Sequence, residues 1–140
     1  MKAHVTRRYL FSASHRLHTD ELSAQQNRHI YGKCNNPFGH GHNYFLEVTV
    51  SGQVDQATGM VCNLVDLDSF VQDQIIDRFD HQNLNTLPEF SASVPTTENL
   101  IRQIHDILQR GFRHAHLEKL RVEETMMNSF EYFGEGRSLR

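Results

Sequence analysis

Residues 40–50 read His-Gly-His-Asn-Tyr-Phe-Leu-Glu-Val-Thr-Val, with His, His, Tyr, Leu, Val and Val at the even positions. The odd positions between them hold Gly, Asn, Phe, Glu and Thr. Successive side chains of a strand point to opposite faces, so this alternation predicts a half-buried β-strand whose apolar face begins with two histidines. Residues 3–15 repeat the pattern, with Ala, Val, Arg, Tyr, Phe, Ala and His at the odd positions.

The two predicted strands are sequential and therefore expected to pair. If they pair as antiparallel neighbours, the end of the first lies beside the start of the second, and His15, His40 and His42 meet at one end of the sheet. The connection over residues 16–39 contains Cys34. A connection of that length is typical of a segment that is functional, disordered or partly helical.

Two helices are expected after these strands. The first is predicted to begin at Asn63 or Asp66, either of which can cap it, and to end near Arg78, directly before Asp80 and His81. The second starts with a capping hydroxyl and an acidic first turn, and a glycine can end it. Its predicted limits are residues 95–111.

The remaining pattern predicts further short strands. A turn over residues 55–59 leads to a short strand at 60–62, and a last long strand covers residues 117–125, with Glu124 on the same face as its apolar residues. A final short strand is expected at 130–133, and residues 134–140 are expected to fray.

Composition restricts the functional class. The chain has 140 residues, expected to form one domain over residues 1–140, and a formal net charge of −3 with no cluster of Lys or Arg, which disfavours binding to nucleic acid or to an anionic membrane. No apolar run has the length of a signal peptide or a membrane span, and two cysteines are too few for a disulfide scaffold. We therefore expect a cytoplasmic protein. Its ten histidines are an unusually high number.

The three histidines predict a metal site. Neutral imidazole suits zinc, and three protein ligands leave a coordination position open for water or substrate, as in catalytic zinc sites. A His-x-His pair alone is more often an ordinary pair of polar strand residues. The convergence of His15 on His40 and His42 favours a divalent metal, most naturally zinc.

Three further features have open alternatives. Cys34 is a fourth ligand that closes a structural zinc site, a thiol that acts as acid or base beside an open site, or an ordinary loop cysteine. Asp80 and His81 form either a functional pair or a solvated helix cap. Glu124 lies on an inward face, where a carboxylate is costly unless it has a partner.

The chain also carries a series of longer motifs in order from about Val5 to Tyr132. They are Phe11-Ser-Ala-Ser-His15-Arg-Leu17, Gly32-Lys-Cys34-Asn-Asn-Pro-Phe-Gly-His40-Gly-His42-Asn-Tyr44, Gly59-Met60, Asp80-His81-Gln-Asn83-Leu84, Thr96-Thr97-Glu98-Asn99 and Glu124-Thr125. Together these motifs resemble the family of 6-pyruvoyltetrahydropterin and 6-carboxytetrahydropterin synthases.

The resemblance implies an α+β tunnelling fold, in which a four-stranded antiparallel sheet carries two helices on one face. Three subunits close into a barrel, two trimers stack into a hexamer, and the active sites lie between subunits. The implied substrate is 7,8-dihydroneopterin triphosphate, from which the synthase eliminates triphosphate.

The resemblance also implies a role for each site residue. Zinc is held by His15, His40 and His42. Cys34 is the acid/base, and Asp80 and His81 complete a proton-transfer triad with it. Glu124 anchors the pterin ring, with Thr97 and Glu98 as further substrate contacts. From charge alone, Lys33, Arg16 and Arg28 are candidates to meet the triphosphate.

The product is the point at which the family divides. The 6-carboxytetrahydropterin synthases of queuosine biosynthesis use the same substrate and metal, and their bacterial members typically have a shorter spacer between the cysteine and the histidine pair. Here five residues separate Cys34 from His40, as in the biopterin enzymes, which favours the pyruvoyl product. Met126 and Met127 replace the acidic and amide residues usual at the rim of the pterin pocket. A non-catalytic zinc-binding protein on the same scaffold is the remaining alternative.

Overall fold

Two long paired strands dominate the computed structural model, which describes residues 1–136. β1 (Lys2–His15) and β2 (His40–Gln53) pair antiparallel over their whole length, from Lys2 opposite Gln53 to His15 opposite His40. The predicted pairing is therefore confirmed, and its register places His15 directly beside His40.

The complete sheet has the order β3-β1-β2-β4-β5. β4 (His116–Thr125) lies antiparallel to β2, β5 (Asn128–Tyr132) lies antiparallel to β4, and the two-residue β3 (Gln82–Asn83) runs parallel to β1. The expected four-stranded antiparallel sheet is thus corrected to five strands with one parallel pair. β3 forms because His81 turns the chain with a φ of 59° and donates its backbone N–H to the Ser12 carbonyl at 2.6 Å, which brings the next residues alongside β1.

The expected short strand at residues 60–62 is also wrong, because these residues form a bend. β1 and β4 already occupy the two edges of β2 near this point, where Ala3 pairs with Gly52 and His116 pairs with Ser51. The segment therefore has no edge of β2 with which to pair.

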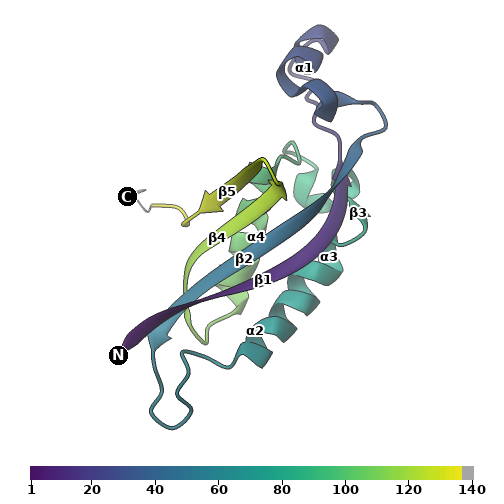
Figure 1. The fold of residues 1–140 in the computed structure, drawn as a ribbon. Coiled ribbons are helices and arrows are strands. Elements are labelled where there is room, and N and C mark those ends of the chain that lie inside the picture. Colours follow the sequence, from purple (N-terminus) through teal and green to yellow (C-terminus); the bar gives the residue numbers. More distant parts are fainter. Residues whose placement is uncertain (137–140) are drawn as a thin grey trace.

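The helices that follow β2 cover one face of the sheet (Figure 1). α2 (Leu64–Val71), a π-helical turn over residues 72–76 and α3 (Asp77–Phe79) form one continuous helical run, and α4 (Thr97–Gly111) lies beside it. Asn63 caps α2, and the Thr96 side chain accepts a hydrogen bond from the backbone N–H of Asn99 at 3.1 Å, so both predicted helix starts are confirmed.

Apolar side chains fill the layer between sheet and helices. This core contains Phe11, Tyr44, Leu46, Val48, Leu67, Ile75, Phe79, Leu100, Ile104, Leu108, Leu120 and Val122, all nearly inaccessible to solvent. The β1, β2 and β4 members alternate along their strands as the sequence pattern predicts. Across the described part of the chain, the helices are too short or too polar to span a bilayer.

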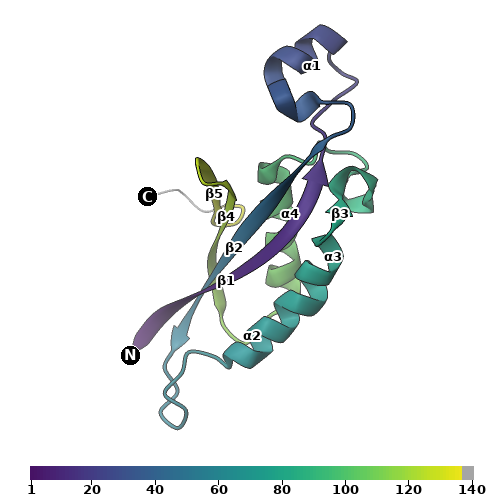
Figure 2. The ribbon, with the colours of Figure 1, turned by 45° about the vertical axis from the view of Figure 1, so that its right-hand side comes forward.

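The long connection between β1 and β2 is partly helical. It contains α1 (Ala24–Tyr31), which Ser23 begins with a reciprocal capping box, and a 3₁₀ turn over Gly32–Asn35. Figures 1 and 2 both show α1 standing beyond the ends of β1 and β2, away from the body of the sheet. The 3₁₀ turn returns the chain to the strand ends and carries Cys34 with it.

Candidate metal centre

Three histidines converge where β1 ends and β2 begins. His15 and His40 are cross-strand neighbours, and His42 lies two residues further along β2 on the same face. The ring centroids are 4.7–5.0 Å apart in all three pairs, and the Nε2 atoms of His15 and His40 are 3.0 Å apart. The predicted meeting of the three imidazoles is therefore present in the fold.

The orientation of the His15 ring is fixed by a contact at its Nδ1 atom. Its side chain is buried, and its Nδ1 lies 2.9 Å from the carbonyl oxygen of Pro95, just before α4. A carbonyl only accepts hydrogen bonds, so Nδ1 carries the hydrogen and Nε2 presents its lone pair to the other histidines. Burial also lowers the pKa of His15 and favours the neutral imidazole that a metal requires. This arrangement, with the second nitrogen held by a carbonyl, is typical of metal-ligating histidines.

His42 provides the clearest test of whether these residues suit a metal. Its Nε2 is buried and makes no hydrogen bond to the described residues, and Glu124 Oε1 lies 3.0 Å away. Burial is the main influence on the pKa of His42 and lowers it. Buried polar atoms are rarely left unsatisfied, and a buried imidazole nitrogen beside two other imidazoles suits a cation.

The possible ligand atoms form two overlapping groups. His15, Cys34 and His40 have ligand atoms within 4.8 Å of one another, and so do His15, His42 and Glu124. His15 belongs to both groups and therefore lies at the centre of the cluster. Nitrogen, sulfur and carboxylate donors in this combination fit zinc better than a hard cation such as Mg²⁺.

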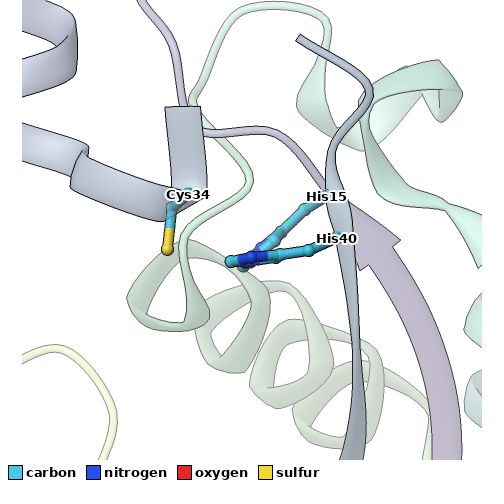
Figure 3. A group of neighbouring side chains, drawn as sticks. All are labelled: His15, Cys34 and His40. Atoms are coloured by element: carbon cyan, nitrogen blue, oxygen red, sulfur yellow. The ribbon is translucent and has the colours of Figure 1, made fainter. Parts of the chain in front are cut away.

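Cys34 approaches the histidines from the 3₁₀ turn (Figure 3). The turn is held in place because Leu17 donates its backbone N–H to the Cys34 carbonyl at 2.7 Å, and the buried Asn35 side chain donates to the Leu17 carbonyl at 2.7 Å. Partial burial, followed by the negative charge of Glu124, raises the pKa of the Cys34 thiol. Without a nearby cation the group is therefore a neutral thiol at physiological pH.

Glu124 belongs to the group with His15 and His42, whereas Cys34 belongs to the group with His15 and His40. Its Oε2 accepts a hydrogen bond from the Thr97 hydroxyl at 2.8 Å, so two of the predicted substrate contacts are together. Glu98, the third, is exposed and lines a separate hollow with Arg102 and Tyr132. Consecutive helix residues point about 100° apart, so the burial of Thr97 turns Glu98 away.

Asp80 and His81 lie at the outer edge of β1. Asp80 Oδ1 accepts the backbone N–H of Ser12 at 2.8 Å, and this hydrogen bond is the main reason for the lowered pKa of Asp80. Asp80 Oδ2 is 3.0 Å from His81 Nδ1, which orients the exposed imidazole. Within residues 1–136 the side-chain hydrogen bonds and ion pairs of Asp80 and His81 run to each other and to Ser12, and none of them reaches Cys34.

Two features of the site were not predicted from the sequence. The Pro95 carbonyl orients His15, but a backbone acceptor leaves no residue-type signal. Tyr44 was expected only as a core residue, yet its hydroxyl is buried without a hydrogen-bond partner in the described structure, two residues after His42 on the same face. Its pKa is raised by burial and then by the charge of Glu124. A tyrosine on the histidine face was the available clue.

Gly39 allows the two strands to meet at the cluster. It has a φ of +73°, and a Cβ on it would lie 2.9 Å from the carbonyl oxygen of His15. We predict that Gly39→Ala lowers the free energy of unfolding by about 2–3 kcal/mol and weakens metal binding, because both the backbone strain and the clash act on the His15 and His40 pair.

Gly59 is the matched control, because it has the same φ of +73° but open space around its Cβ position. Gly59→Ala should cost only the backbone strain, about 1 kcal/mol, and leave metal affinity unchanged. Urea denaturation and a zinc titration of both variants make the comparison. Equal effects of the two substitutions on zinc affinity would contradict a positioning role for Gly39.

Comparison with known proteins shows what this chain resembles. The family model described as 6-pyruvoyl tetrahydropterin synthase matches residues 4–135. The human 6-pyruvoyl tetrahydrobiopterin synthase is 48% identical over 96% of this chain and 93% of its own length. The structure of Caenorhabditis elegans 6-pyruvoyl tetrahydropterin synthase superposes with a TM-score of 0.89 at 37% identity and covers 96% of this chain and 97% of the other. A putative 6-carboxy-5,6,7,8-tetrahydropterin synthase of Archaeoglobus fulgidus is 35% identical over 61% of this chain and 68% of its own.

Proposed function

The chain belongs to the 6-pyruvoyl tetrahydropterin synthase family, and on that basis we propose that it is a zinc-dependent lyase of tetrahydrobiopterin biosynthesis. It converts 7,8-dihydroneopterin triphosphate to 6-pyruvoyltetrahydropterin with elimination of triphosphate. The observation that carries the proposal is the convergence of the His15, His40 and His42 rings, with Cys34 grouped with His15 and His40, and Glu124 grouped with His15 and His42.

Each side of the cluster has its own task. His15, His40 and His42 would hold the zinc ion, which when bound supplies Lewis-acid polarisation of the substrate's side-chain oxygen. Cys34 moves protons to and from the adjacent carbon as general acid and base. Glu124 accepts paired hydrogen bonds from the 2-amino group and the neighbouring ring N–H of the pterin, with Thr97 fixing its second oxygen at 2.8 Å.

The pyruvoyl product is favoured over the carboxy product by two observations. The spacer between Cys34 and His40 has the five residues of the biopterin enzymes. The similarity to the human synthase spans nearly the whole chain, whereas the similarity to the Archaeoglobus protein covers less of it at lower identity.

The function is tested by incubating the zinc-loaded protein with 7,8-dihydroneopterin triphosphate and identifying the products by mass spectrometry. We expect 6-pyruvoyltetrahydropterin and inorganic triphosphate. Release of acetaldehyde with 6-carboxytetrahydropterin as the main product would assign the chain to the queuosine reaction instead.

We further propose that the active protein is a hexamer of two stacked trimers, with each site completed by a neighbouring subunit. Two features support this assembly. The outer edge of β1 pairs with β3 only at Ala13 and Ser14, and such open edges are usually covered. Asp80 and His81 need a second chain if they are to reach a Cys34. A stable monomer at micromolar concentration in analytical ultracentrifugation would contradict the proposal.

Glu124→Gln tests the pterin anchor. The amide offers one acceptor and one donor where the carboxylate offers two acceptors, so we expect pterin affinity to fall about 10- to 1000-fold, or about 1.4–4 kcal/mol. Zinc content should stay at the wild-type level if Glu124 is an anchor and not a ligand. A fluorescence titration with the pterin and metal analysis measure the two effects, and unchanged pterin affinity would rule out the anchor.

A further inference from the structure

A pocket of about 610 Å³ opens beside the histidine cluster, between α1 and the 3₁₀ turn. Its lining includes three cationic side chains, those of Arg16, Arg28 and Lys33, together with His18 and His40, and no carboxylate from the described residues. The chain as a whole has a formal net charge of −3, so this concentration of basic groups is local. Such a pocket attracts an anion with several negative charges.

The basic groups come from separate segments that the fold holds together. The backbone of Arg16 is fixed by the Asn85 side chain, which accepts from its N–H at 2.7 Å and donates to its carbonyl at 2.9 Å. Its guanidinium Nε donates to the Asn35 carbonyl at 3.3 Å, which leaves the terminal nitrogens available. The Asn35 side chain also contacts His18 Nδ1 at 3.0 Å, so Asn35 contacts both Arg16 and His18 in the pocket lining.

Arg28 and Lys33 are exposed and form no salt bridge within residues 1–136. Other arginines of this chain are paired, such as Arg7 with Asp68 at 2.8 Å and Arg121 with Glu47 at 2.7 Å. The carboxylate of Asp20 lies 3.3 Å from His18 Nε2 but does not line the pocket. The arginine and lysine donors are therefore free for an external anion.

The position of the pocket matches one part of the proposed substrate. Glu124 groups with His42, whereas Cys34 groups with His40, which itself lines the pocket. The order along the site is thus carboxylate, histidine cluster, basic pocket. The order along 7,8-dihydroneopterin triphosphate is pterin ring, hydroxylated side chain, triphosphate.

We infer that this pocket is the polyphosphate subsite, in which Arg28 and Lys33 bind the triphosphate group of the substrate and, after elimination, the free triphosphate. The inference rests on the proposed function for the identity of the substrate, but not for the binding of a polyphosphate. Arginine and lysine form charge-assisted hydrogen bonds with phosphate oxygens, and an exposed site of this kind weakens as salt rises.

The test is isothermal titration of the zinc-loaded full chain with inorganic triphosphate in magnesium buffer, with zinc content measured before and after. We expect Arg28→Ala and Lys33→Ala each to weaken binding about 5- to 30-fold, and wild-type affinity to fall as salt is raised. Arg113→Ala is the matched control. Arg113 is exposed and lies just before β4. The start of β4 pairs with Ser51, at the end of β2 opposite to the end that holds His40. Arg113→Ala should leave the affinity unchanged.

Three outcomes would refute the assignment of this pocket as the polyphosphate subsite. They are no binding of triphosphate, equal triphosphate affinity in the pocket variants and the wild type, or a loss of affinity in Arg113→Ala as large as that in the pocket variants. A pocket that binds triphosphate in a protein that forms no pyruvoyl product would leave the subsite standing and refute the proposed function. If the protein forms 6-pyruvoyltetrahydropterin but Arg28→Ala and Lys33→Ala bind triphosphate as tightly as the wild type, the proposed function stands and the subsite is refuted.

Discussion

Cys34→Ala is expected to abolish turnover while leaving the metal site intact. General acid/base groups typically contribute about 10²- to 10⁴-fold, so kcat should fall by that amount. Zinc occupancy, assembly and the substrate dissociation constant should stay near their wild-type values, because the three histidines and Glu124 are unchanged. Steady-state kinetics, metal analysis and a binding titration on this single variant measure all of these quantities.

The same variant separates a catalytic thiol from a structural ligand. The Cys34 sulfur belongs to one of the two possible ligand groups, so the geometry alone permits either role. If Cys34 closed a structural site, its removal would release zinc and destabilise the fold, since structural zinc contributes directly to folding free energy. Cys62→Ala is the control, because Cys62 is the second partly exposed free cysteine and lies outside both ligand groups. It should retain full activity.

His40→Ala is expected to remove the zinc ion and with it the activity. Loss of an outer partner of a zinc ligand typically weakens metal binding about 10- to 100-fold, so loss of a ligand should cost more than about 100-fold. After dialysis against a chelator the variant should contain almost no zinc, and its turnover should fall by at least about 10³-fold because no Lewis acid remains. His40 is only partly buried, so its replacement threatens the core less than that of His15.

His29→Ala is the matched control for that loss, because His29 is an exposed histidine on α1 outside the cluster. It should keep both zinc and activity. Retention of zinc and turnover by His40→Ala would show that His40 is not a ligand.

The two long strands were predictable from sequence because the two faces of β1 and β2 lie in different environments. Alternation over residues 3–15 and 40–50 predicted the faces, and the sequential order of the strands predicted the antiparallel pairing that brings His15 to the start of β2, whereas the exact register comes from the structure. The helix starts were predictable for a similar local reason, since Asn63 and Thr96 satisfy free N–H groups of the first turn.

The features that the sequence did not predict depend on tertiary contacts. β3 exists because one hydrogen bond from His81 brings two residues beside β1, and residues 60–62 form no strand because both neighbouring edges are occupied. Within one chain Glu98 does not join Thr97 and Glu124, because the burial of Thr97 turns the next residue outward, and a contact of Glu98 with the substrate stays a prediction. The support of His15 by Pro95 also arises only in the folded chain.

Anomalous X-ray scattering at the zinc edge from crystals of the zinc-loaded protein tests the metal centre most directly. We predict one peak per chain at about 2.0–2.1 Å from Nε2 of His15, His40 and His42, with the Cys34 sulfur and the Glu124 carboxylate outside bonding distance. A peak bonded to Cys34 Sγ at about 2.3 Å, or one that leaves out His40 or His42, would contradict the three-histidine catalytic site.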